Sequence, residues 1–141
     1  MLQALATPRD RTRTFILLAA CGAAGIAAAL IGIDDNPPGI FLALAAAVAF
    51  VLAFVHPWRT PKQFGRLLLA SGLGVLLFAV LHNVLEALAG TAEDIAALQD
   101  LLDGLAVAAF LLATLLCPAA ILVSVVAFVV ALIRNRRLST G

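Results

Sequence analysis

The sequence has very few charged and aromatic side chains. Charged residues make up 12% of its 141 residues and aromatic residues 6%, with one tryptophan and no tyrosine, whereas hydrophobic residues make up 64%. In a soluble domain about one quarter of the residues are charged, because much of its surface remains in water. We therefore exclude a water-soluble globule and expect a protein whose surface faces lipid.

The chain also has few residues that carry redox, metal or covalent chemistry. Cys21 and Cys117 are its only cysteines and form no Cys-x-x-Cys motif, which excludes a vicinal redox pair. His56 and His82 lie near opposite ends of the expected helices, so they cannot ligate one haem together. Lys62 lies in a loop, which excludes an intramembrane Schiff base. The sequence also lacks a glycine-rich phosphate-binding motif and a G-x-S-x-G nucleophile motif.

Four apolar segments are each long enough to cross a bilayer. A hydrocarbon core of about 30 Å needs about 20 helical residues, and we predict spans at about residues 15–33, 38–56, 67–89 and 105–133. No segment alternates apolar and polar residues as a membrane β-barrel would. The sequence therefore predicts an all-α membrane protein, a bundle of four transmembrane helices. Its domain plan is an N-terminal lead (1–14), a single transmembrane domain (15–133) and a basic tail (134–141).

The basic residues predict the orientation of the chain. All nine lysines and arginines precede the first span, separate the second span from the third, or follow the fourth. Every acidic residue except Asp10 maps to the opposite side or its boundary. Because lysine and arginine remain in the cytoplasm, we expect a multi-pass protein of the cytoplasmic (inner) membrane, with both termini cytoplasmic.

The loop between the second and third spans is rich in residues that suit the membrane surface. Trp58, Arg59, Lys62 and Arg66 are predicted to anchor the protein at this interface, the tryptophan among headgroups and the cations against anionic lipid. The basic residues flank the membrane and form no nucleic-acid-binding face. The expected partner of these residues is the lipid bilayer.

Local signals predict how several helices begin and bend. Asn36 is placed to cap the second helix, and Pro37 suits its first position. A sequence typical of a capping box begins at Thr91, and apolar residues then recur at helical spacing through residues 92–103. We expect a short amphipathic helix on the outer surface before the fourth span, or a direct continuation into that span. Pro118 is predicted to kink the fourth span.

Small residues recur at intervals of three or four in two of the spans. They are Gly22, Gly25, Ala29 and Gly32 in the first span, and Ala70, Ser71, Gly72 and Gly74 in the third. In lipid such residues allow helix backbones to approach closely. They predict close packing within one bundle or between copies of the chain.

One polar cluster lies within the apolar segments. His82 and Glu86 are one helical turn apart on the third span, Asn83 flanks them, and Asp34 and Asp35 end the first span on the same side. A histidine and several carboxylates at one depth could hold a divalent metal or move protons. A metal, if bound, would use His82, Glu86, Asp34 and Asp35. The alternative is a structural pair that satisfies itself, and we predict no cofactor.

Three classes of function remain. We expect a non-catalytic accessory, assembly or interaction subunit of a larger membrane complex, because the chain is small and its polar chemistry is sparse. One alternative is a small oligomeric transporter or channel that uses His82 and Glu86 near the outer face. The other is a membrane enzyme with a metal or acid–base site at the same face.

Overall fold

The computed structural model describes residues 2–33, 35–92 and 95–139, and within these ranges the secondary structure is helical. Four helical segments are long and apolar enough to cross a membrane, Pro8–Ile31, Pro37–Val55, Pro61–Thr91 and Ala96–Arg134. The prediction of an all-helical chain with four helices long and apolar enough to cross a membrane is therefore confirmed. The elements in order are η1 (Leu2–Leu5), α1 (Pro8–Ile31), α2 (Pro37–Val55), α3 (Pro61–Thr91), α4 (Ala96–Leu111), η2 (Leu112–Leu116) and α5 (Cys117–Ser139).

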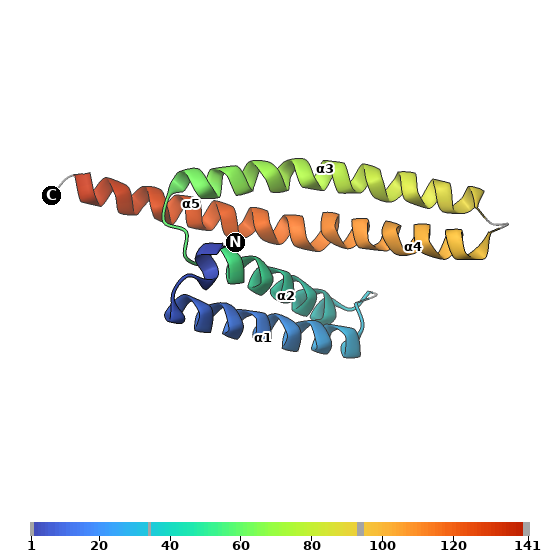
Figure 1. The fold of residues 1–141 in the computed structure, drawn as a ribbon, viewed down its shortest axis with the longest axis horizontal. Helices are drawn as coiled ribbons and strands as arrows, with labels where there is room; N and C mark the ends of the chain where they lie inside the picture. Colours follow the sequence, from blue (N-terminus) through green and yellow to red (C-terminus); the bar gives the residue numbers. More distant parts are fainter. Residues whose placement is uncertain (1, 34, 93–94, 140–141) are drawn as a thin grey trace.

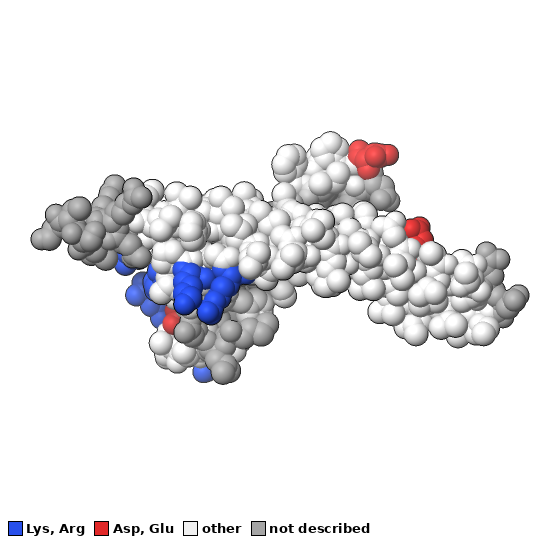
Figure 2. All heavy atoms as spheres, turned by 90° about the horizontal axis from the view of Figure 1, so that it is seen from above, with Lys and Arg blue, Asp and Glu red and all other residues white. Residues whose placement is uncertain are grey.

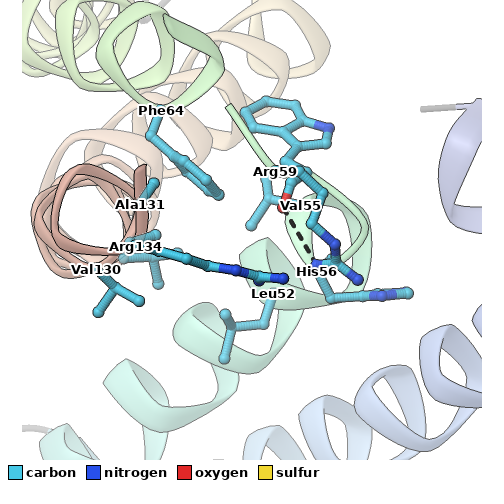
Figure 3. A pocket seen from close by; sticks show the side chains of 11 residues that line it. Leu52, Val55, His56, Arg59, Phe64, Val130, Ala131 and Arg134 are labelled. Atoms are coloured by element: carbon cyan, nitrogen blue, oxygen red, sulfur yellow. Dashed lines mark hydrogen bonds between the residues drawn. The ribbon is translucent and has the colours of Figure 1, made fainter. Parts of the chain in front are cut away.

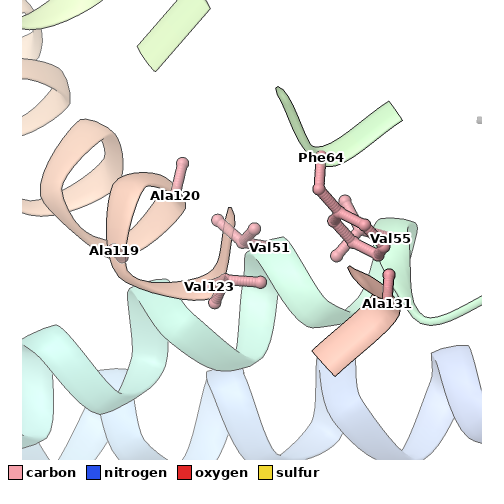
Figure 4. Packing of buried hydrophobic residues seen from close by; sticks show 7 residues of the cluster. All are labelled: Val51, Val55, Phe64, Ala119, Ala120, Val123 and Ala131. Atoms are coloured by element: carbon pink, nitrogen blue, oxygen red, sulfur yellow. The ribbon is translucent and has the colours of Figure 1, made fainter. Parts of the chain in front are cut away.

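The helices form two antiparallel hairpins that meet along α2 and α5 (Figure 1). α1 packs along α2, and α3 packs along α4 and α5. The main chain of α1 contacts only α2 and η1 among the described elements. The buried core lies where α2, the start of α3 and α5 meet (Figure 4), and consists of Val51, Val55, Phe64, Ala119, Ala120, Val123 and Ala131. Its small side chains allow the backbones to approach closely, which is how helices associate in lipid.

The hairpins differ in length. α2 has 19 residues and α3 has 31, which correspond to about 28 Å and about 46 Å of helix. The two helices are joined by a short loop, so the difference appears at the far end, where α3 and α4 extend past the α1–α2 turn (Figure 1). Asp35 in this turn lines a groove together with Phe110 of α4. The turn is therefore level with Phe110, and α4 continues for about 21 Å beyond it to Ala96.

The prediction of a separate amphipathic helix on the outer surface is wrong. The alternative, that this segment continues directly into the fourth span, is confirmed. Residues 96–103 form the first turns of α4, which continues through η2 into α5 without interruption. Gly104, within α4, weakens a helix by only about 1 kcal/mol, which packing against α3 can offset. The capping box expected at Thr91 includes Glu93 and Asp94, which lie outside the described residues.

The irregularity predicted at Pro118 lies one turn before it. Proline has no N–H, so the carbonyl of Thr114 lacks its usual helical donor. The helix widens at η2, a π-helical turn, and the N–H of Cys117 bonds to the carbonyl of Leu112. The Thr114 hydroxyl donates to the Phe110 carbonyl at 2.7 Å. Such wide turns let a membrane helix pass a proline without ending.

The Asn36 side chain stabilises the α1–α2 turn through a hydrogen bond to α1, not by capping α2 as predicted. Asn36 precedes α2 and Pro37 begins it, as expected, but the Asn36 side chain makes no capping hydrogen bond to α2. Its Nδ2 donates instead to the carbonyl of Ile31 at 3.0 Å. Gly32 ends α1 with a φ of 85°, a conformation that favours glycine. The turn is thus fixed mainly through the end of α1.

Only some of the small residues lie at close contacts. A Cβ added to Gly74 would lie 3.0 Å from Cys117 Sγ, so close packing of α3 on α5 is confirmed there. Gly22, Gly25 and Gly72 have open space where a Cβ would project. The tightest position is Gly39 at the start of α2, where an added Cβ would lie 1.7 Å from the carbonyl oxygen of Gly32.

Replacing Gly39 by alanine should therefore separate α1 from α2 at their turn. Because the clash is with backbone, we expect Gly39→Ala to lower the free energy of unfolding by about 3 kcal/mol. Gly22→Ala is the matched control and should be neutral or stabilising by up to about 1 kcal/mol. Unfolding of the purified protein in mixed detergent micelles, followed by circular dichroism, measures both. Equal effects of the two substitutions would contradict the contact.

Candidate functional site

The polar cluster predicted on α3 is partly assembled in the structure. His82 is half-buried, and its Nδ1 lies 3.0 Å from the carbonyl oxygen of Ala106 in α4. Because a carbonyl only accepts, Nδ1 carries the hydrogen of this bond. The ring packs on Phe110 with centroids 5.3 Å apart, and Nε2 lies 3.8 Å from Glu86 Oε2. His82 therefore ties α3 to α4 and pairs with Glu86, as the i, i+4 spacing predicts.

The other members of the cluster do not join this pair. Asn83 Nδ2 donates to the Ala79 carbonyl of its own helix at 2.7 Å, and the Glu86 side chain is 68% exposed. Asp35 lines the groove beside Phe110, the residue that also packs on His82, whereas Asp34 lies outside the described residues. Within the ranges that the structure describes, no three His, Cys, Asp or Glu side chains are grouped so that they could hold a metal ion.

The four predicted interface anchors lie in the α2–α3 loop and the first turns of α3, at the other end of α3 from His82 (Figure 1). In the view of Figure 2 the visible Lys and Arg side chains gather in one region, apart from the visible Asp and Glu side chains on the far half of the molecule. Lys62 and Arg66 are exposed. Trp58 is half-buried, and its ring lies 5.7 Å from that of Phe64. Arg59 Nη1 donates to the carbonyls of His56 and Trp58 at 3.1 and 3.3 Å. Arg59 thus holds the α2–α3 loop in shape as well as presenting charge.

A buried hydrogen-bonded contact at this end was not predicted from the sequence. Thr14 of α1 is 2% exposed, and its hydroxyl lies 3.1 Å from the carbonyl of Ala53 and 2.9 Å from that of Ala4. In a regular helix the Ala53 carbonyl would accept from the N–H of residue 57, which is Pro57 here. The single hydrogen of the Thr14 hydroxyl is shared between the Ala4 and Ala53 carbonyls, so Thr14 offers Ala53 a donor in place of the missing N–H and joins α1 to the end of α2.

His56 extends this contact to the surface. Its Nε2 lies 3.0 Å from the Thr14 hydroxyl, and its Nδ1 lies 4.0 Å from Asp10 Oδ1. Nδ1 is buried and has no hydrogen-bond partner among the described atoms. Asp10 is held in place by Thr7, whose hydroxyl donates to Oδ2 at 2.7 Å and accepts from the Asp10 N–H. Asp10 was notable in the sequence as the one acid among the cations, but nothing there linked it to His56.

Next to His56, a cavity of about 230 Å³ opens between the end of α2, the start of α3 and α5 (Figure 3). The guanidinium groups of Arg59 and Arg134 both reach toward its His56 side (Figure 3). The remaining wall is apolar or aromatic and consists of Leu52, Val55, Trp58, Phe64, Val123, Ala127, Val130 and Ala131. The arrangement combines two arginine side chains with an apolar wall, which suits an anionic amphiphile.

No known protein family, curated protein or solved structure matches this chain. Any functional proposal therefore depends on the geometry and chemistry of the chain itself.

Removing the Thr14 hydroxyl should loosen α1 from α2. We expect Thr14→Val to lower the free energy of unfolding by about 1–3 kcal/mol, because it removes the one hydroxyl donor that the Ala4 and Ala53 carbonyls share. Thr14→Ser should retain most of the stability. Thr12→Val, on the exposed side of α1 where the hydroxyl bonds to its own helix, should change stability by less than about 0.5 kcal/mol. Thermal unfolding in detergent compares them. Similar losses at Thr12 and Thr14 would contradict the contact.

Proposed function

We propose that this chain is a non-catalytic interaction subunit of a larger complex in the cytoplasmic membrane. Both termini and the α2–α3 loop lie in the cytoplasm, and the far end of the α3–α4 hairpin contacts another subunit. We call this part, Leu81–Thr91 and Ala96–Phe110, the outer hairpin. The observation that carries the proposal is an apolar face on the outer hairpin that no other described helix covers.

The proposed orientation is supported by the charges of the described residues. Three cations lie in the α2–α3 loop and the first turns of α3, namely Arg59, Lys62 and Arg66. Arg134 of α5 lines the same cavity as Arg59. Cations of this kind remain on the cytoplasmic side during insertion. The outer hairpin is then on the opposite, external side.

The lengths of the helices support an outer hairpin that leaves the hydrocarbon. α2 is about 28 Å long, close to the hydrocarbon thickness of about 30 Å. The outer hairpin begins where α2 and its turn end, so it lies at or beyond the external surface. Its side chains agree, because Glu86, Asp100 and Asp103 are exposed there. An aspartate at the centre of the hydrocarbon would cost about 3 kcal/mol.

This same section nevertheless has large exposed apolar side chains on both helices. On α3 they recur at intervals of three and four, and on α4 likewise, so each set lies on one side of its helix. In an antiparallel pair, both sets fall on the same side of the α3–α4 contact, opposite Asn83, Glu86 and Asp103. We call this surface the leucine face, and it consists of Leu81, Val84, Leu88, Leu98, Leu101 and Leu105.

The exposure of the leucine face supports the proposal that another protein binds there. The main chain of α4 contacts only α3 and η2 among the described elements, so neither α1 nor α2 covers it. Burying one leucine fully is worth about 1.5–3 kcal/mol, and contiguous apolar surface outside lipid marks an interaction site. The alternating intervals of three and four residues suit an apolar helical partner that inserts its side chains between them.

The proposed orientation predicts which loops react with a reagent that cannot cross the membrane. In a chain whose Cys21 and Cys117 are replaced by alanine, Asp103→Cys should be labelled by an impermeant maleimide on intact cells. Lys62→Cys should be labelled only after the membrane is permeabilised. We expect a labelling ratio of at least about tenfold between intact and opened cells. Labelling of Lys62→Cys from outside would overturn the orientation.

The leucine face predicts where a partner crosslinks. With a photoreactive phenylalanine analogue in place of Leu101, irradiation of native membranes should give one discrete product with a different polypeptide. The same analogue at Asp103, two residues away on the polar side, is the matched control and should give little of it. Leu101→Glu should abolish the complex on native gels while unfolding stability changes by less than about 0.5 kcal/mol. Equal products at both positions, or products with the chain itself only, would contradict the proposal.

A further inference from the structure

We propose that the cavity beside His56 binds the phosphate headgroup of an anionic phospholipid, with the lipid's glycerol and first methylenes lying against α2 and α5. This site is separate from the leucine face and does not depend on the proposed partner.

The charged part of the cavity suits a phosphate. Arg59 and Arg134 come from the loop after α2 and from the end of α5, so two segments far apart in the sequence present guanidinium groups to one space (Figure 3). Guanidinium presents five N–H donors in a planar fork that matches phosphate oxygens. Arg59 uses Nη1 on the carbonyls of His56 and Trp58, which fixes the group and leaves its other nitrogens for a ligand.

The charge balance around the cavity favours an anion. No acidic residue is among the described residues that line it. Asp10, the acid at this end, lines a neighbouring cavity with Arg59 and Gln63 and lies 4.0 Å from His56 Nδ1. Among the described residues it forms no ion pair with Arg59. The two arginines therefore face a space without a carboxylate to neutralise them, and a lipid phosphate supplies the missing negative charge.

The apolar part of the cavity distinguishes a lipid from free phosphate. Leu52 and Val55 on α2 face Val123 and Ala127 on α5, and this wall belongs to or adjoins the buried core. A free inorganic phosphate gains nothing from such a surface, whereas glycerol and methylene groups do. Trp58 lines the cavity as well, and indole rings characteristically lie at headgroup level.

The position of the cavity agrees with this ligand. It lies at the ends of α2 and of the apolar part of α5, at the level where the cations of the α2–α3 loop gather. Basic pockets between membrane helices at the cytoplasmic surface are typical sites for anionic headgroups. A lipid bound here would join the end of α2 to α5, the two helices that hold the hairpins together.

The single tryptophan of the chain gives a direct measurement, because Trp58 lines the cavity. The full-length protein is placed in nanodiscs of zwitterionic lipid, and brominated phosphatidylglycerol or brominated phosphatidylcholine is added in matched steps. We expect saturable quenching of Trp58 by the anionic lipid at a mole fraction about tenfold lower than for the zwitterionic one.

Variants identify the residues responsible. Arg59→Gln and Arg134→Gln should each reduce the preference for the anionic lipid by about tenfold. Arg66→Gln removes the same charge from an exposed position outside the cavity and should leave the preference within about twofold. Arg134 is itself exposed, so its replacement should leave the fold intact, which circular dichroism verifies. An equal loss with Arg66→Gln would overturn the site in favour of diffuse surface charge.

Soluble competitors separate the sources of phosphate. Inorganic phosphate and glycerol 3-phosphate at millimolar concentration should leave the quenching by brominated phosphatidylglycerol unchanged, because they lack the apolar portion. If either displaces the lipid, the cavity is a soluble-phosphate site and the lipid proposal is wrong. Equal quenching by the two brominated lipids would also overturn it.

Discussion

The contact between α2 and α5 is the constraint on which the rest of the structure depends. Among the described elements, α2 alone of the first hairpin meets the second hairpin, through α5 and η2. Hydrophobicity does not drive helices together in lipid, so this contact depends on close packing of small side chains such as Ala119 and Ala120 against Val51. Because it lies toward the loop end of the bundle, it forms a cavity there and leaves the far end of α3 and α4 uncovered.

Backbone hydrogen bonding explains two features that hydropathy does not. In lipid each backbone carbonyl needs a donor from the protein, and two prolines remove one each. At Pro57 the helix ends, and the hydroxyl of Thr14, from another helix, hydrogen-bonds to the Ala53 carbonyl. At Pro118 the helix continues, and the wide turn η2 accommodates the change within one chain segment. The same chemical loss therefore gives an interhelical contact in one place and a local distortion in the other.

The four long apolar helices could be predicted from the sequence, because the length of each apolar segment alone specifies them. Helix ends were predicted less well, since they depend on local residues: α1 begins at Pro8, after Thr7 caps it, well before the apolar segment starts. The His82–Glu86 pair followed from helical spacing. The contact between Thr14 and His56 joins residues 42 positions apart, and no local pattern predicts which hydroxyl lies beside which ring. The leucine face could not be predicted from one helical segment, because it combines residues of α3 and α4 that only the antiparallel packing brings to one side.

The unequal lengths of the hairpins give the two ends of the molecule independent chemistry. α2, with 19 residues, is only about as long as the hydrocarbon of a bilayer is thick. α3 shares the loop end with α2 but continues past the α1–α2 turn, where it packs along α4. His82 ties α3 to α4 near the level of this turn. Among the described elements α4 makes no main-chain contact with α2, so the outer hairpin takes no direct part in the α2–α5 contact. The cavity at the cation-rich end is correspondingly lined without any residue of the outer hairpin.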